Sequence, residues 1–358
     1  MTGRGIDQVL PYPSDPAIHE DYVKNAKDYV QLAERTNGPI PKLVDFSYIW
    51  GDALEILETE TPDLRIINLE TSVTKSNDYW KGKGINYRMN PGNVPCLTAA
   101  KVDCCCLANN HILDWGYSGL TETLATLNKS GIKTCGAGKN KELAINPAII
   151  KGKRNGKTII FSFGSVSSGV PLDWAALDKR PGVNWIDEKG PGTIQNIKEN
   201  VTRIKEPGDT VIASIHWGSN WGYEIPLEQR EFAHKLVDEA QVDLIHGHSS
   251  HHVKGIEVYN DKLILYGCGD FLNDYEGILD RYEEFRGDLT LMYFADLQPT
   301  TGRIVLLRMM PMRIKRFRIN NASKQDSEWL KKVLCREGDK FGTGANVESK
   351  GILSLTWT

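Results

Sequence analysis

The sequence contains no long hydrophobic run. A membrane-spanning helix needs roughly 18 or more consecutive apolar residues, and no such stretch is present. The N-terminal region is polar, with Asp, Glu and Pro scattered through it, and lacks the pattern of a secretory signal peptide. We therefore expect a cytoplasmic protein, and membrane association stays open if further residues precede Met1.

Cysteine is scarce and has no metal-motif spacing. The seven cysteines are an odd number and none forms a Cys-x-x-Cys pair, which favours a reduced compartment over a disulfide framework. The run Cys104-Cys105-Cys106 lies in an apolar segment, and we expect it to pack as small hydrophobic side chains.

A strong charge of either sign is also missing. The formal net charge is −3 and the isoelectric point is about 6.3, so no basic field predicts binding to nucleic acid or to an anionic membrane. The 358 residues are enough for a substantial core, in one large domain or two small ones.

Strand-like and helix-like patterns alternate along the chain, which predicts a mixed α/β layered fold. Antiparallel strands are expected toward the C-terminal end, beginning with a hairpin across Asn260-Asp261. The expected strands are 64–68, 102–107, 158–163, 210–215, 242–245, 256–259, 263–266, 289–297 and 304–310, and the expected helices are 20–34, 49–58, 118–129, 227–241 and 327–334.

Six of the eight histidines lie in three short segments, each directly after an apolar strand. Open α/β sheets bind ligands at the carboxyl ends of their strands, so we expect these imidazoles to converge. Converging imidazoles indicate metal binding or acid/base chemistry. The segments are Asn109-Asn110-His111, His216-Trp217-Gly218 and 246–252.

The segment 246–252 is the strongest of these signals. Four histidines in seven residues are hard to bury as packing residues because unpaired imidazoles are costly, and an exposed polar loop is the weaker alternative. Taken alone, His216 is a weak signal, because a single histidine at a strand end can be a hydrogen-bonded core residue, and the segment 108–114 fits a turn slightly better. Glu70 also follows a strand, and Asp270 is a candidate for orienting a histidine or an ordinary turn aspartate.

Five motifs in order resemble those of the CapA (poly-γ-glutamate capsule biosynthesis) proteins, which look like members of the calcineurin-like metallophosphatase superfamily. The resemblance runs from about residue 1 to about residue 275 and implies a four-layer α/β/β/α sandwich. We expect it to fill a domain of residues 1–310, with 311–358 as an extension packed on it. The motifs are Asn68-Leu69-Glu70, Ala108-Asn109-Asn110-His111-Ile-Leu-Asp114, His216-Trp217-Gly218, Gly247-His248-x-x-His251 and Gly269-Asp270-Phe271.

The resemblance also implies a site for one or two divalent ions at the strand ends. A mixed set of Asn, Glu and His ligands suits Mn, Fe or Zn better than Ca. His111, held by Asp114, takes the catalytic or phosphate-facing place, while Asp270 and His252 lie behind the ligands. The implied metal ligands are Glu70, Asn110, His216, His248 and His251, and the substrate-binding candidates are Arg88 (with Lys83), Asn109 and Trp217.

The chain departs from the family pattern in two places. The closing motif has two residues between His248 and His251, followed by His252, so the imidazoles that face the site are not fixed by the motif. The family opens with a strand ending in Gly-Asp-Val-Met-x-x-Arg, whose aspartate binds metal, whereas this chain starts as if at the methionine of that motif. We expect the first strand to be missing through a start assigned too far downstream or a shortened chain, with a degenerate site as the alternative.

Three functions follow. The first is a metal-dependent hydrolase or transferase acting on poly-γ-glutamate or a related acidic substrate, working with subunits of a capsule-synthesis machinery. The second is an acid/base enzyme for a peptide or amino-acid substrate that needs no metal. The third is a non-catalytic polymer-binding subunit with an aromatic surface made of Trp174, Trp185, Trp217 and Trp221.

Overall fold

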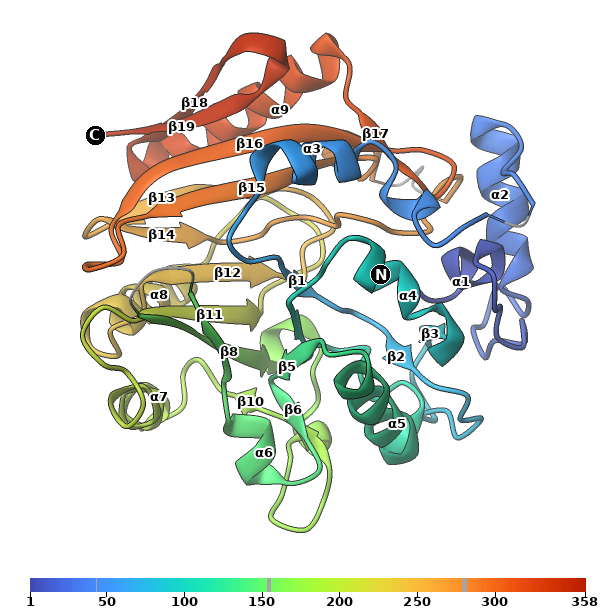
Figure 1. The fold of residues 1–358 in the computed structure, drawn as a ribbon, viewed down its shortest axis with the longest axis horizontal. Coiled ribbons are helices and arrows are strands. Elements are labelled where there is room, and N and C mark those ends of the chain that lie inside the picture. Colours follow the sequence, from blue (N-terminus) through green and yellow to red (C-terminus); the bar gives the residue numbers. More distant parts are fainter. Residues whose placement is uncertain (43, 153–155, 279–281) are drawn as a thin grey trace.

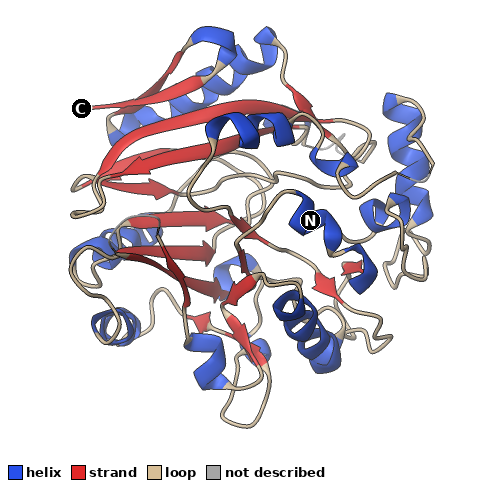
Figure 2. Cartoon of the chain, in the orientation of Figure 1, coloured by secondary structure: helices blue, strands red, loops and turns tan. Residues whose placement is uncertain are grey.

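The structure is a computed structural model that describes residues 1–358 except 43, 153–155 and 279–281. Two sheets face each other in the middle of the molecule, and helices cover their outer faces (Figure 1, Figure 2). The predicted four-layer α/β/β/α sandwich is confirmed. Among the described residues, no helix is long and apolar enough to cross a membrane.

The first central sheet is short and parallel, with the order β1-β4-β5. Its side chains alternate between the two faces: Cys105 and Leu107 pack outward with Leu120, while Cys104 and Cys106 pack inward toward the other sheet. The elements are β1 (Ile66–Asn68), β4 (Cys104–Cys106), β5 (Lys133–Cys135) and the covering helices α4 (Pro95–Ala99) and α5 (Gly116–Lys129).

The second central sheet has the order β10-β8-β11-β12-β14-β13, with β7 on β8. Its middle strands are parallel and buried on both faces, which explains their continuous apolar runs. Phe161 and Val211 face the outer helices, where Phe232 packs against them. The elements are β7 (Ala148–Lys151), β8 (Lys157–Ser165), β10 (Trp185–Ile186), β11 (Thr210–His216), β12 (Leu244–His248), β13 (Ile256–Tyr259), β14 (Lys262–Leu265), α7 (Thr193–Thr202) and α8 (Leu227–Asp238).

A third, antiparallel sheet extends the sandwich in the order β15-β16-β19-β18, with β17 also paired to β16. Helix α9 lies on it, and Ser323 and Asp326 form a capping box at the start of that helix. Strand β16 continues through the expected boundary between residues 310 and 311, and the division into two units stays a prediction. The elements are β15 (Leu289–Leu297), β16 (Ile304–Ile314), β17 (Ile319–Asn321), α9 (Lys324–Gly338), β18 (Thr343–Val347) and β19 (Leu353–Trp357).

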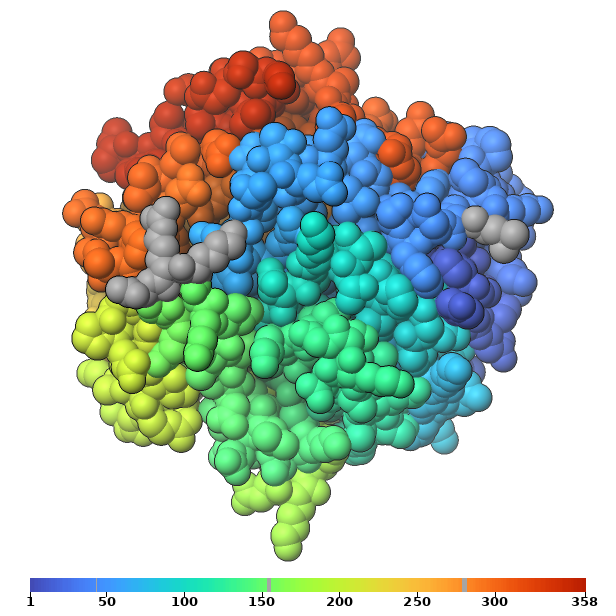
Figure 3. Space-filling model, in the orientation of Figure 1, coloured from blue at the N-terminus to red at the C-terminus, as the bar shows by residue number. Residues whose placement is uncertain are grey.

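The N-terminal segment packs beside the first sheet, and its surface is continuous with that of the C-terminal segment in the space-filling view (Figure 3). The helix expected over 20–34 starts at Lys27 instead, because residues 17 and 25 form a bridge before it. The remaining elements are α1 (Gly5–Val9), α2 (Lys27–Asn37), α3 (Ala53–Glu60), α6 (Lys141–Ile145), β2 (Ser72–Val73), β3 (Arg88–Met89), β6 (Ala137–Gly138) and β9 (Gly182–Val183).

Candidate active site

The strand ends bring the predicted histidines together. Strands β11 and β12 are parallel and in a register that places His216 beside His248, the last residue of each strand. The two rings are joined through their Nδ1 atoms at 2.8 Å, and His248 Nε2 lies 2.9 Å from Ser214 Oγ. Both nitrogens of His248 therefore already have partners within the protein.

Glu70 lies between histidines delivered by the two central sheets. Its Oε1 is 3.9 Å from His111 Nε2, after β4, and 3.8 Å from His216 Nε2, at the end of β11. Its Oε2 accepts a hydrogen bond of 2.9 Å from Asn68 Nδ2. Asn109 in turn donates to Asn68 Oδ1 at 2.9 Å, so this amide chain fixes the carboxylate between the sheets.

His111 is held by two charged groups. Its Nδ1 lies 2.7 Å from Asp114 Oδ2 and 2.9 Å from Lys83 Nζ, and Lys83 also forms an ion pair with Asp114. Burial, and secondly the Lys83 charge, lower the pKa of His111 despite the opposing effect of Asp114. The imidazole is therefore neutral near pH 7, with Nε2 directed toward Glu70.

His251 and Asp270 form a second pair. The His251 Nδ1 atom is 3.0 Å from Asp270 Oδ2, and the His251 Nε2 atom is 3.5 Å from the Tyr275 hydroxyl. Burial opposes a charge on His251, but the Asp270 carboxylate outweighs it and raises the pKa of that imidazole. Asn273 Nδ2 donates to Asp270 at 3.0 Å and holds the carboxylate in place. Asp270 thus occupies the place expected of a histidine-orienting group.

Two predicted metal ligands carry buried polar atoms with no hydrogen-bond partner among the described residues: His216 Nε2 and Asn110 Oδ1. Leaving such an atom unpaired costs about 1–3 kcal/mol, so a native structure ordinarily provides a partner. Burial, and next the His251 charge, lower the pKa of His216 to about 3, which keeps its ring in the neutral form that binds metal. An imidazole nitrogen, an amide oxygen and the adjacent Glu70 carboxylate are suitable ligands for a divalent transition metal. The residues present therefore fit such an ion.

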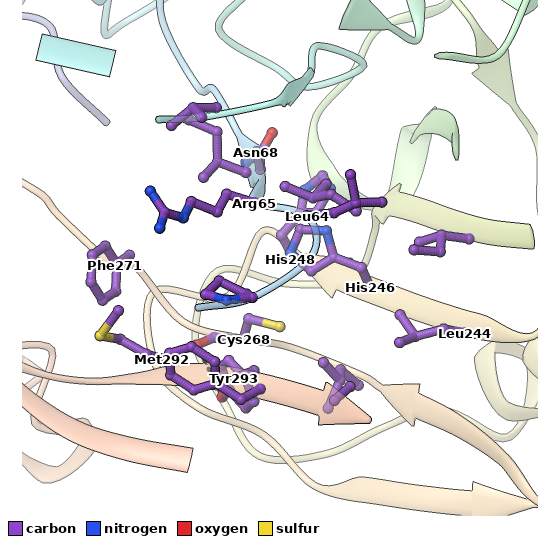
Figure 4. Close-up of a pocket in the computed structure, with 18 of the residues that line it drawn as sticks. Leu64, Arg65, Asn68, Leu244, His246, His248, Cys268, Phe271, Met292 and Tyr293 are labelled. Carbon is purple, nitrogen blue, oxygen red and sulfur yellow. Dashed lines mark hydrogen bonds between the residues drawn. The ribbon is translucent and has the colours of Figure 1, made fainter. Parts of the chain in front are cut away.

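A cavity of about 730 Å³ opens beside this cluster, between β1 and the strands β12, β14 and β15. Glu70, His248 and Asp270 line its polar end. Figure 4 shows His246, His248 and Cys268 on one side, with Arg65 and Asn68 from the β1 segment and Met292 and Tyr293 from β15 around them. The site thus adjoins a space large enough for a small molecule or a polymer segment.

Arg88 is not brought to the cluster. Its guanidinium donates to the main-chain oxygens of Ser76 and Asp15 and lies 3.9 Å above the Trp115 ring. The pairing of β3 with β2 sets this direction. Its donors are used in holding loops together, which does not fit the predicted carboxylate-binding role. Lys83, expected on a solvated loop or at the substrate, is instead the residue that contacts His111.

Trp217 and His252 also lie apart from the cluster. The Trp217 side chain is buried, and its Nε1 donates a hydrogen bond to Tyr266 O at 2.9 Å. Its backbone N–H donates to His248 O, so the chain stays paired with β12 one residue beyond the end of β11. His252 Nδ1 faces Val253 O, and its ring stacks on Phe285. Trp217, expected at the substrate, is thus a core residue, and His252, expected behind the metal ligands, packs against aromatic rings instead.

Sequence reasoning missed three contributors to this site. Asn68, Ser214 and Tyr275 hold Glu70, His248 and His251 respectively, and none carries a metal-binding or catalytic signal of its own. Asn68 lies in the Asn-Leu-Glu motif, and its position two residues before Glu70 is a usable clue. Asn109, expected at the substrate, is fully buried and serves the same supporting purpose.

Comparison with known proteins gives consistent results. A family model described as "Bacterial capsule synthesis protein PGA_cap" matches residues 1–275. A "probable polyglutamine synthesis accessory protein" of Mycobacterium tuberculosis strain H37Rv is 46% identical over 357 residues, which cover 99% of this chain and 93% of that protein.

Two Bacillus proteins match over a shorter range. The "PGA biosynthesis protein CapA" of Bacillus subtilis is 31% identical over 209 residues, covering 58% of this chain and 52% of its own. The "capsule biosynthesis protein CapA" of Bacillus anthracis is 26% identical over 207 residues, covering 56% and 47% respectively. The matched region thus spans about half the length of these two relatives.

Proposed function

This chain belongs to the PGA_cap family of bacterial capsule synthesis proteins, within the metallophosphatase-like superfamily, and we propose that it is a metal-dependent hydrolase or transferase. The proposed substrate is poly-γ-glutamate or a related acidic molecule, following the names of the relatives. The observation that carries the proposal is the unpaired, buried His216 Nε2, 3.8 Å from Glu70 Oε1, together with the unpaired, buried Oδ1 of Asn110 in the same motif as His111.

The proposed ligands are Glu70, Asn110 and His216. His251 lies near enough for its charge to act on His216, but it would join only by giving up its Nε2 contact with Tyr275. His248 would join only by giving up its contact with His216 or Ser214. A bound Mn, Fe or Zn ion would supply Lewis-acid activation of a phosphoryl or acyl centre and of the attacking water.

His111 carries the proposed proton-transfer role. Its Nε2 faces the Glu70 carboxylate at 3.9 Å, while Asp114 and Lys83 fix the ring from the Nδ1 side. A neutral imidazole in this position accepts a proton at Nε2 and returns it to the leaving group. The Asp114 carboxylate stabilises the charge that appears on the ring during this exchange.

The test is to follow cleavage of poly-γ-glutamate by size-exclusion chromatography and, in parallel, of an activated phosphodiester, each with added Mn²⁺, Fe²⁺ or Zn²⁺. We expect metal-stimulated turnover that His216→Ala abolishes. His234→Ala is the matched control, since His234 pairs with Glu257 on the α8 side of the second sheet and should leave turnover unchanged. Absence of turnover on both probes with every metal would reject the proposal.

A second candidate is acid/base catalysis without metal. It is favoured by the Asp114–His111 pair at 2.7 Å, which is complete within the chain. Under this alternative, chelation leaves turnover unchanged while His111→Ala removes it. The third function, an aromatic polymer-binding surface, loses support because Trp174 and Trp217 are buried.

A further inference from the structure

Three consecutive cysteines on β4 are divided between two environments. Alternation along the strand points Cys105 to the outer core beside α5, whereas Cys104 and Cys106 point inward to the second sheet. Cys135 stands next to Cys106 in the register of β4 and β5 and faces the same way. Three thiols are thus gathered in the centre of the sandwich, all of them buried.

The spacing of these sulfur atoms matches a metal site. The Sγ atoms of Cys104, Cys106 and Cys135 all lie within 4.8 Å of one another, and those of Cys106 and Cys135 are 3.8 Å apart. Zinc–sulfur bonds of about 2.3 Å in tetrahedral geometry place neighbouring sulfurs about 3.8 Å apart. A disulfide requires about 2.05 Å, so the three cysteines are free thiols.

A histidine of the facing sheet lies near this cluster. His246, in β12, is close enough to Cys106 and Cys268 for their charges to act on it, and its Nδ1 lies 3.0 Å from Ser214 Oγ. A zinc-binding histidine ordinarily binds through one ring nitrogen and is oriented by a hydrogen bond at the other. Ser214 would supply that hydrogen bond, leaving Nε2 for a metal.

We propose that Cys104, Cys106 and Cys135 bind a structural Zn²⁺ ion between the two central sheets, and that the neighbouring His246 moves in as the fourth ligand. This site is separate from the proposed nitrogen- and oxygen-ligand site around Glu70 and does not depend on it. Its ligand set, three cysteines and one histidine, is one of the common closed zinc geometries. His246 also lines the cavity beside the active site, together with Cys268.

The test is zinc X-ray absorption spectroscopy on the full chain, purified without chelator and loaded with one equivalent of Zn²⁺. We expect sulfur scatterers at about 2.3 Å and a nitrogen at about 2.0 Å. Spectra with only nitrogen and oxygen neighbours would overturn the proposal, as would mass spectrometry showing a disulfide among these cysteines. The first result would return the cluster to packing of small apolar side chains, and the second would make it a covalent link between β4 and β5.

Variants separate this site from the active site. Cys106→Ser should remove the sulfur-bound zinc, whereas Cys105→Ser, equally buried in the same strand, should retain it. His216→Ala should also retain the sulfur signal, because His216 belongs to the other site. Sulfur-bound zinc that persists in Cys106→Ser would contradict the assignment. If Cys106→Ser does not fold, Cys135→Ala tests the same ligand set, and the wild-type spectrum alone remains decisive.

Discussion

Two buried polar clusters lie near the N-terminal segment, and they differ in how completely their groups are paired. In the first, the Arg4 guanidinium donates two hydrogen bonds to Asp274, at 2.9 and 2.6 Å, and one of 2.9 Å to Glu20. The Tyr29 ring lies 3.8 Å from the same guanidinium, and its hydroxyl binds Glu20. All of these charges have partners.

The second cluster is the histidine site, which is equally buried but incompletely paired. His216 Nε2 and Asn110 Oδ1 have no hydrogen-bond partner among the described residues, and His216 Nε2 lies 3.8 Å from the Glu70 carboxylate. Fully paired buried polar groups stabilise a fold, whereas a buried polar atom without a partner calls for an explanation such as a bound water or ion. The comparison therefore supports a structural role for the Arg4 cluster and the proposed ligand-binding role for the histidine cluster.

The largest expected effect comes from a substitution that breaks the Arg4 cluster. Asp274→Ala leaves the Arg4 charge buried with only Glu20, and we expect a loss of about 3–5 kcal/mol in the free energy of unfolding. Urea denaturation monitored by circular dichroism measures it. A loss below 1 kcal/mol would mean that the paired cluster is not structural.

The next effect concerns the unpaired cluster. Metal at about 100 times its dissociation constant should stabilise the wild-type chain by about 2.7 kcal/mol, and His216→Ala should lose this gain. Urea denaturation with and without metal measures the gain in the free energy of unfolding. Each protein is compared with its own metal-free form, so that any loss of packing in the variant cancels. An unchanged gain in the variant would remove His216 from the ligand set.

A smaller effect, on metal affinity, is expected from changing Asp270, whose carboxylate orients His251. Asp270→Asn keeps the shape of the side chain but removes the charge that orients His251, so we expect metal affinity to fall about 10- to 100-fold. Isothermal titration calorimetry measures the affinity. Equal affinities would show that the His251–Asp270 pair does not act on the metal.

The smallest effect is a control for the Arg4 cluster. Lys189 and Glu228 form an ion pair at 3.3 Å, with side chains 70% and 55% exposed. Lys189→Ala should change the free energy of unfolding by less than about 1 kcal/mol, because water screens exposed pairs. A loss matching that of Asp274→Ala would show that burial does not explain the difference between ion pairs in this chain.

Much of the fold and the histidine convergence was predictable from the sequence. His216 and His248 each follow an apolar run of the length of a buried strand, and parallel strands necessarily end at the same edge. The position of Glu70 near these histidines follows from the same argument applied to β1. The four layers, by contrast, rested on the resemblance, since alternating strands and helices fit several α/β arrangements.

The rest depended on tertiary contacts that leave no periodic pattern. Lys83 lies in an irregular loop, and only the folded chain brings it to His111. Arg88 was placed at the substrate by its type, but its strand pairing turns it toward Trp115. The cysteine run packs as small buried side chains, as expected, but alternation identifies a face without identifying what shares it, here Cys135.

The central claim is that the histidine cluster binds a divalent ion, and metal content per chain tests it most directly. The protein would be equilibrated with Mn²⁺, Fe²⁺ or Zn²⁺, freed of unbound metal by gel filtration, and analysed by elemental mass spectrometry in a Cys106→Ser background so that sulfur-bound zinc is not counted. The account predicts one or two ions per chain, lost when His216→Ala is added and kept when His234→Ala is added. No bound metal with any of the three ions, or equal content in both histidine variants, would contradict it.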